Sequence, residues 1–132
     1  YSDYAHHPTE IAATLSAARK ITKGRLIIVF QSHTYSRTAE LFDGFVSAFA
    51  DLGVDKLILC PIYAARETNT YGITSENLAD AIYEKNKSVV CADSLEKAAE
   101  IAEADGKDGD VIVVMGAGDV IKVAEILEGN AK

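Results

Sequence analysis

The first ten residues of this 132-residue chain carry several side chains that can bind an anion or move a proton. Asp3, Tyr4, His6 and His7 lie within five positions, and residues 8–10 (Pro-Thr-Glu) are typical of a helix start. Free backbone N–H groups at a helix start attract anions, so we interpret the imidazoles as anion-contacting groups. A general-base role stays open because imidazole titrates near neutral pH. Chemistry so close to the first residue also indicates a piece of a longer protein.

A second group of polar side chains, residues 31–38, directly follows an apolar run. It supplies the imidazole of His33, the guanidinium of Arg37 and several hydroxyls. A cation in the first turn of a helix opposes the helix dipole, so we expect Arg37 to have an anionic partner. The alternative is that Thr34 or Ser36 simply caps the helix and that Arg37 is solvated.

Two more loops that could carry chemistry also follow apolar runs. Residues 61–68 contain Arg66 and Glu67, which are most simply solvated loop charges. Residues 116–119 (Gly-Ala-Gly-Asp) allow close approach to a ligand or a neighbouring loop, or they form a tight turn capped by Asp119. This G-x-G follows the last apolar run rather than the first, which argues against a dinucleotide-binding fingerprint.

A sheet is needed to position these groups, and its strands are visible as four short apolar runs. They predict buried strands at residues 26–30, 57–60, 88–91 and 111–115. Apolar residues at helical spacing predict helices at residues 9–21, 36–52, 74–85, 95–103 and 119–127. The connections are long enough for crossover helices, so we expect an α/β fold with a mainly parallel sheet. Ligands bind such sheets beyond the carboxyl ends of the strands, where the polar groups follow the apolar runs.

Composition limits the class of protein further. The chain is 48% hydrophobic and 25% charged, which fits one globular domain over residues 1–132. A net charge of −7 argues against general nucleic-acid binding. Cys60 and Cys91 follow apolar runs, so we expect buried, free thiols in a reducing cytoplasm. We expect no signal peptide, no membrane span and no metal site built from the three histidines.

Residues 3–10, 30–38, 62–67 and 116–119 together resemble the C-terminal domain of bacterial UDP-N-acetylmuramate–L-alanine ligases, which belong to the Mur ligases. The motifs occur in family order, at about the family's spacing, over nearly the whole chain. The resemblance implies a Rossmann-like three-layer α/β sandwich and a part in peptidoglycan synthesis. In that family, ATP phosphorylates the carboxylate of UDP-N-acetylmuramate with the help of Mg²⁺, and the amine of L-alanine attacks the acyl phosphate.

The resemblance also implies what lies outside this sequence. The family has an N-terminal domain that holds the UDP-sugar and a central domain whose P-loop holds ATP. No P-loop motif occurs in this sequence, so we expect ATP and Mg²⁺ to be bound mainly elsewhere. We therefore expect this chain to be inactive alone and to work with those two domains as partners.

Roles for individual residues follow from the same resemblance. It implies that Asp3 binds the ribose hydroxyls of the nucleotide. His6 would face the reacting phosphate and the incoming amino acid, with Tyr4 beside it. His33 and Arg37 correspond to the pocket for the amino-acid carboxylate, which a guanidinium can bind through two hydrogen bonds.

The chain departs from the family pattern in the second motif. Some members have a proline in place of Ser32 and an arginine in place of Thr34. With one arginine fewer, either Arg37 carries more of the carboxylate binding or another domain contributes. Glu67 and the turn at residues 116–119 are implied to shape the rim of the same pocket.

Two alternatives stay open on the sequence. A domain of another Mur ligase or of a folylpolyglutamate-type ligase would share the fold but use other anchoring residues; the His6-His7 pair and the Arg37 cluster favour the alanine-adding type. A free-standing α/β binding or regulatory module is the other alternative. A receiver-like module would need an acidic cluster at the strand ends, which the runs ending at residues 30, 60 and 115 do not supply.

Overall fold

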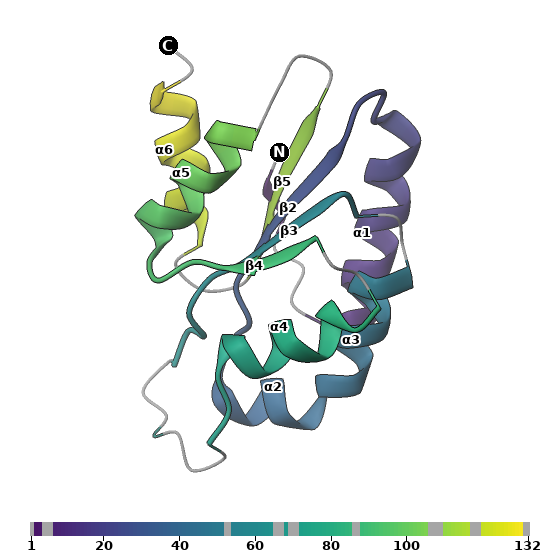
Figure 1. Cartoon of the computed structure of the whole chain (residues 1–132), viewed down its shortest axis with the longest axis vertical. Helices are drawn as coiled ribbons and strands as arrows, with labels where there is room; N and C mark the ends of the chain where they lie inside the picture. The colour runs from purple at the N-terminus through teal and green to yellow at the C-terminus, as the bar shows by residue number, and fades with distance from the viewer. Residues whose placement is uncertain are drawn as a thin grey trace.

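The computed structural model describes residues 2–3, 7–51, 54–64, 68, 72–85, 88–105, 110–116 and 120–130. Within these residues the chain forms a five-stranded sheet in the order β1-β5-β2-β3-β4, and every neighbouring pair is parallel (Figure 1). The strands are β1 (Ser2–Asp3), β2 (Leu26–Phe30), β3 (Lys56–Leu59), β4 (Val89–Cys91) and β5 (Val111–Met115). The four predicted strands and the parallel sheet are confirmed, and β1 is an addition that no apolar run predicts.

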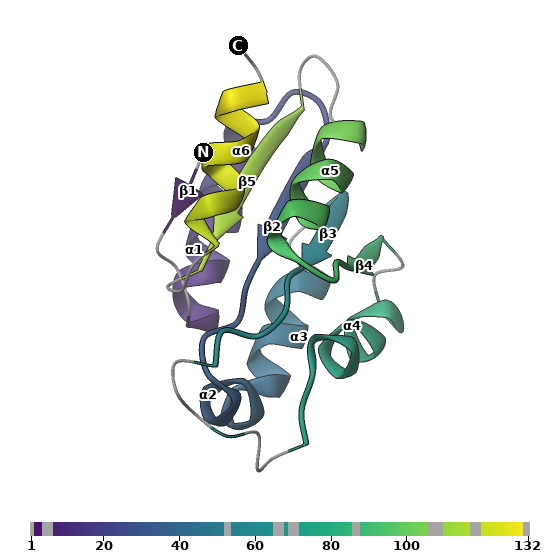
Figure 2. The ribbon, with the colours of Figure 1, turned by 90° about the vertical axis from the view of Figure 1, so that its left-hand side faces the viewer.

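Helices cover both faces of the sheet, which confirms the three-layer α/β sandwich (Figures 1 and 2). One face carries α1 (Pro8–Ile21), α3 (Phe42–Asp51) and α4 (Ser75–Tyr83). The other face carries α5 (Leu95–Asp105) and α6 (Ile121–Asn130). The short α2 (Tyr35–Glu40) lies below the sheet in both views, at the end where β2 finishes. None of the helices in the described segments is long and apolar enough to cross a bilayer.

The strand β2 lies in the middle of the sheet and is buried along its whole length. Ile28 and Phe30 face the layer of α1, α3 and α4, where the Phe30 and Phe49 ring centroids are 5.0 Å apart. Ile27 and Val29 face α5 and α6. Side chains alternate across a strand, so a strand covered on both faces must be apolar at every position, as this one is.

Polar side chains fix where the helices begin. The Nδ1 atom of His7 accepts a hydrogen bond from the Thr9 backbone N–H (3.2 Å), and Glu10 accepts one from the His7 backbone N–H (3.3 Å). This reciprocal cap, followed by a proline, starts α1 where the sequence predicts it. Thr74 caps α4 in the same way, and the Ser94 hydroxyl accepts from the first turn of α5.

The single helix predicted at residues 36–52 is wrong, because the chain bends at Leu41. There φ is −103° and ψ is 15°, which ends α2 one residue before α3 begins. The hydrogen bonds from Leu41 N–H to the Arg37 carbonyl (2.9 Å) and from Phe45 N–H to the Leu41 carbonyl (3.0 Å) persist through the bend. The apolar spacing also continues across it, so periodicity contains no sign of the break.

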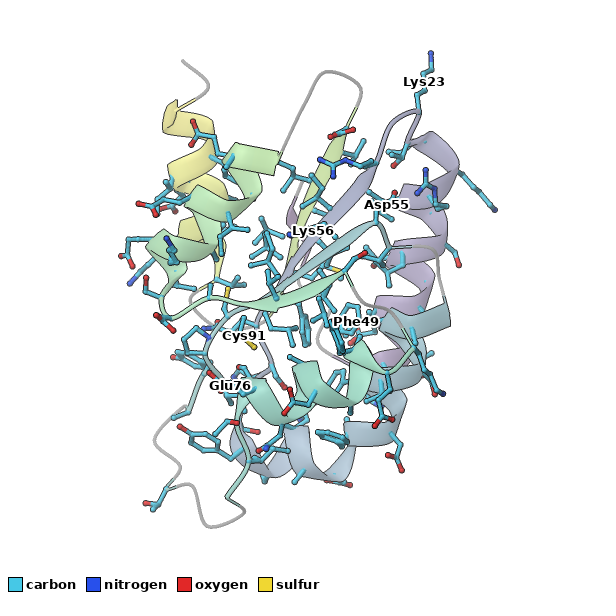
Figure 3. All side chains as sticks on the ribbon, viewed as in Figure 1. Lys23, Phe49, Asp55, Lys56, Glu76 and Cys91 are labelled. Atoms are coloured by element: carbon cyan, nitrogen blue, oxygen red, sulfur yellow. The ribbon has the colours of Figure 1, made fainter. Side chains whose placement is uncertain are left out.

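At the edge where β2 and β3 begin, the Asp55 carboxylate joins α1 to the sheet (Figure 3). Its Oδ2 atom accepts hydrogen bonds from Nη1 of Arg19 (2.8 Å) and from the Leu26 backbone N–H (2.7 Å). Burial raises the pKa of Asp55, but these hydrogen bonds and the positive charge of Arg19 lower it by more, so the pKa lies below 3.8.

Asp55→Asn is expected to lower the free energy of unfolding near neutral pH by about 1 kcal/mol, because the contact with Arg19 is partly screened by solvent. The folded pKa is depressed, so the ionised carboxylate stabilises the fold above its unfolded pKa, and this stabilisation is lost as the pH falls through the folded pKa. Urea unfolding of both proteins between about pH 6 and pH 2.5 should give a difference that shrinks with acid. Glu125→Gln, an exposed carboxylate on α6, is the matched control. A difference that stays constant down to the lowest pH would contradict this role for Asp55.

Candidate functional site

All five strands end at the same edge of the sheet, here called the carboxyl edge. The register pairs Asp3 with Met115, Met115 with Phe30, Phe30 with Leu59, and Leu59 with Cys91. β1 and β2 are separated only by β5, so the ends of these two strands are about 10 Å apart. β1 therefore ends at the same edge of the sheet as β2, from which the chain continues to α2 and Arg37.

The packing of the first helix supports the same arrangement. A Cβ atom placed on Gly44 would lie 2.9 Å from Cγ of Pro8, so α3 requires a glycine to approach the start of α1 this closely. Because α3 directly continues α2, the His7-Pro8 start and the Arg37 helix are on neighbouring elements. His7 itself is the cap of α1, which uses its Nδ1 atom in the fold.

The loops that follow β2 and β3 continue to pair beyond the sheet. Tyr63 N–H donates to the Ser32 carbonyl (2.9 Å), and Thr34 N–H donates to the Tyr63 carbonyl (2.7 Å). Between these bonds, the rings of His33 and Tyr63 stack with centroids 5.4 Å apart and an interplanar angle of 29°. His33 is half-buried and is held against the second loop at the carboxyl edge.

The Arg37 side chain is half-buried in the first turn of α2. Its backbone N–H donates to the Thr34 hydroxyl (3.3 Å). Of the two candidate caps named from the sequence, Thr34 and Ser36, the cap is therefore Thr34. In the part of the chain that the structure describes, no carboxylate lies within 4.0 Å of the Arg37 guanidinium. The anionic partner expected for this cation stays a prediction, and an external anion could supply it.

Gln31, for which the sequence predicts no role, joins three loops at the carboxyl edge. Its side chain is buried, Nε2 donates to the Pro61 carbonyl (3.2 Å), and Oε1 accepts from the Val120 N–H (3.1 Å). Gly116 lies against it with φ +150°, and a Cβ atom there would be 2.9 Å from the Gln31 carbonyl oxygen. The close approach expected of Gly116 is therefore confirmed, and it is an approach to a neighbouring loop. The sequence signal that could have predicted the role of Gln31 is an amide side chain directly after a buried strand.

A pocket of about 250 Å³ opens at the same edge, between the loops after β3 and β4 and the start of α4. Tyr35, Ile62, Thr74, Glu76 and Asp93 are among its lining residues. Tyr35 belongs to the turn of α2 that carries the guanidinium described above, so the pocket adjoins the predicted amino-acid-binding loop.

Both cysteines are free thiols, with Cys60 buried and Cys91 half-buried rather than fully buried as expected. Burial, together with the carboxylates of Glu76, Asp80 and Asp93, raises the pKa of Cys91 to about 11 (Figure 3). Its thiol is therefore protonated at neutral pH. Among the described residues, no three His, Cys, Asp or Glu side chains gather as a metal ion would need.

Several predicted site residues lie outside the described residues. These are Tyr4, His6 and Glu67, together with Arg66 and Asp119. The backbone of Asp3 ends β1, and nothing is described of its side chain. The roles of all the predicted site residues remain predictions. The structure places His33 in the loop after β2 and Arg37 in the first turn of α2, both at the carboxyl edge.

The chain matches a known protein family over most of its length. Residues 1–118 match the family described as Mur ligase, glutamate ligase domain. The chain belongs to this family. The UDP-N-acetylmuramate–L-alanine ligase of Clostridium perfringens is 48% identical over 124 residues, which are 94% of this chain and 27% of that protein. The chain thus spans just over a quarter of the length of such Mur ligases.

Solved Mur ligase structures have the same fold. The UDP-N-acetylmuramate-alanine ligase of Thermotoga maritima superposes with a TM-score of 0.72 and 21% identity, over 99% of this chain and 26% of that one. The murein peptide ligase of Psychrobacter arcticus superposes with a TM-score of 0.74 and 23% identity, over 96% of this chain and 26% of that one. At these identities the likeness concerns the fold alone.

Proposed function

We propose that this chain is the amino-acid- and nucleotide-contacting domain of an ATP-dependent, cytoplasmic ligase that joins L-alanine to UDP-N-acetylmuramate. The observation that carries the proposal is the 48% identity to the Clostridium perfringens ligase, which extends over 94% of this chain. The matched part is the C-terminal part of that ligase. The remaining part of such an enzyme would supply the sites for the UDP-sugar and for most of ATP.

In the proposed reaction, the γ-phosphate of ATP is transferred to the carboxylate of UDP-N-acetylmuramate, which leaves ADP and an acyl phosphate. The amine of L-alanine then attacks the acyl carbon, loses a proton and displaces phosphate, so that an amide forms. Mg²⁺ would neutralise phosphate charge in the first step, and we assign none of the described residues to it. The work of this domain is to hold L-alanine beside the acyl phosphate, which is a task of orientation and electrostatics.

We assign Arg37 and His33 to the carboxylate of L-alanine. Arg37 supports this role because its guanidinium has no carboxylate partner among the described residues, so an incoming anion can bind it. His33 supports it because its ring is held at the same edge by Tyr63.

The amino-terminal residues are assigned to the nucleotide and the reaction centre. Asp3 is proposed to bind the ribose, and His6 and Tyr4 are proposed to face the reacting groups. The register of β1 supports these roles, because the segment after Asp3 starts at the carboxyl edge. A ligand held near Arg37 would lie at this same edge of the sheet.

A chimera tests the proposed function. In the Clostridium perfringens ligase, the segment that matches this chain is replaced by residues 1–132. We expect ADP release that depends on both L-alanine and UDP-N-acetylmuramate, and we expect none from this chain alone. The same assay with glutamate in place of L-alanine tests the amino-acid choice that the folylpolyglutamate alternative implies. A folded chimera without alanine-dependent turnover, or turnover by the isolated chain, would refute the proposal.

A further inference from the structure

The backbone at Thr34 is strained. Its φ is 64° and its ψ is 150°, and it is the one non-glycine residue with a positive φ in the described part of the chain. A β-branched residue avoids this region, which glycine adopts without steric cost. Such a conformation persists only where the surrounding structure holds it. It therefore marks a position at which the fold imposes a backbone geometry of high local energy.

Two buried hydroxyls lie next to the Thr34 carbonyl group and hydrogen-bond in sequence to it. Thr38 is fully buried, and its hydroxyl donates to the Thr34 carbonyl oxygen (2.6 Å) while its backbone N–H donates to the same oxygen (3.2 Å). The hydroxyl of the buried Ser32 lies 2.5 Å from the Thr38 hydroxyl. A hydroxyl has one hydrogen, and that of Thr38 points to Thr34, so Ser32 is the donor in this pair.

The held residue sits between the two side chains assigned to the amino-acid carboxylate. His33 is paired with Tyr63 in the extension of the sheet, and Arg37 is in the first turn of α2. The dihedral angles of Thr34 set the direction in which α2 leaves that extension. A change of φ to a negative value would turn α2 and carry the Arg37 guanidinium away from His33.

We propose that Thr38 is a positioning residue: its buried hydroxyl holds Thr34 in a strained conformation that keeps Arg37 and His33 aimed at one carboxylate. This inference rests on the proposed function. Thr38 touches no substrate in this scheme and acts only through the backbone of Thr34. A change of Thr34 to a negative φ would lower the conformational energy of its backbone. Loss of the Thr38 hydroxyl should therefore allow this change.

Thr38→Val keeps the shape of the side chain and removes the hydroxyl, and Thr38→Ser keeps the hydroxyl. In the chimera, Thr38→Val should raise the KM for L-alanine by about fivefold, the effect of one hydrogen bond, while kcat and the KM for ATP change by less than about twofold. Thr38→Ser should behave like the parent. Ser32→Ala, which removes the donor to Thr38, should shift the same KM in the same direction by a smaller factor, and it decides the question if Thr38→Val does not fold.

The strain itself is tested by adding Thr34→Gly to Thr38→Val. Glycine has no strain to release, so the double variant should recover most of the alanine KM, which a merely structural effect of Thr38 would not do. NMR couplings of this chain should also report a positive φ at residue 34 in the parent and in Thr38→Ser, and a negative φ in Thr38→Val. An unchanged φ in Thr38→Val, an unchanged alanine KM, or no recovery in the double variant would overturn the inference. Because the φ measurement needs no turnover, an inactive parent chimera would count against the proposed function alone.

Discussion

Arg37→Ala is expected to raise the KM for L-alanine by roughly 10- to 100-fold in the chimeric ligase, because it removes a charge-assisted contact of about 1.5–3 kcal/mol. The guanidinium is half-buried at the carboxyl edge and has no carboxylate partner among the described residues, so its removal leaves none of their carboxylates without a partner. The effect should therefore appear in substrate binding and spare stability. Steady-state ADP release at varied L-alanine measures it.

Two variants give this measurement its controls. Arg37→Lys keeps the positive charge but loses the bidentate pair of N–H donors. Its KM for L-alanine should therefore lie between those of the parent and of Arg37→Ala. Arg19→Ala removes an arginine at the opposite edge of the sheet, where it contacts Asp55, and should lower stability without changing the alanine KM. An unchanged KM in Arg37→Ala would remove Arg37 from the amino-acid pocket.

The strands of the sheet were predictable because their apolar runs are continuous and end abruptly. The runs at residues 26–30 and 111–115 match β2 and β5 at both ends. β1 has only two residues, Ser2 and Asp3, and exists through its pairing with β5, which no local pattern encodes. The bend at Leu41 was missed for a related reason, since one changed pair of dihedral angles leaves the apolar face of the helix intact.

The grouping of the site at one edge was also predictable, because parallel strands all end on the same side. The buried hydrogen bonds that join the loops of the site were not predictable. Gln31 and Ser32 are polar residues that the sequence places in a loop, and Thr38 is a polar residue near the start of a predicted helix, yet all three are buried. The packing of the loops determines which groups these side chains hydrogen-bond. Such pairings follow no regular spacing in the sequence. The start of α1 was predictable from Pro8, but the cap was not, because the sequence indicated an anion-contacting imidazole and the structure uses His7 Nδ1 to cap the helix.

Gly116→Ala is expected to lower the free energy of unfolding by about 2–4 kcal/mol, through backbone strain at a positive φ and overpacking. Its φ is +150°, and the added methyl group would lie 2.8 Å from the Val120 side chain and 2.9 Å from the Gln31 carbonyl oxygen. The backbone oxygen cannot turn aside as a flexible side chain would. The methyl group should therefore push apart the loops after β2 and β5.

Gly72→Ala separates the two causes. Gly72 also has a positive φ, +63°, but a Cβ atom there would meet nothing within 4 Å. This variant carries the backbone cost alone, partly offset by the lower entropy of its unfolded chain, so a loss of about 1 kcal/mol or less is expected. Urea unfolding of the three proteins measures the difference, and hydrogen exchange at the Val120 N–H should speed up in Gly116→Ala only, since that group donates to Gln31. Equal losses in the two variants would mean that the contact with Gln31 is not what requires a glycine at position 116.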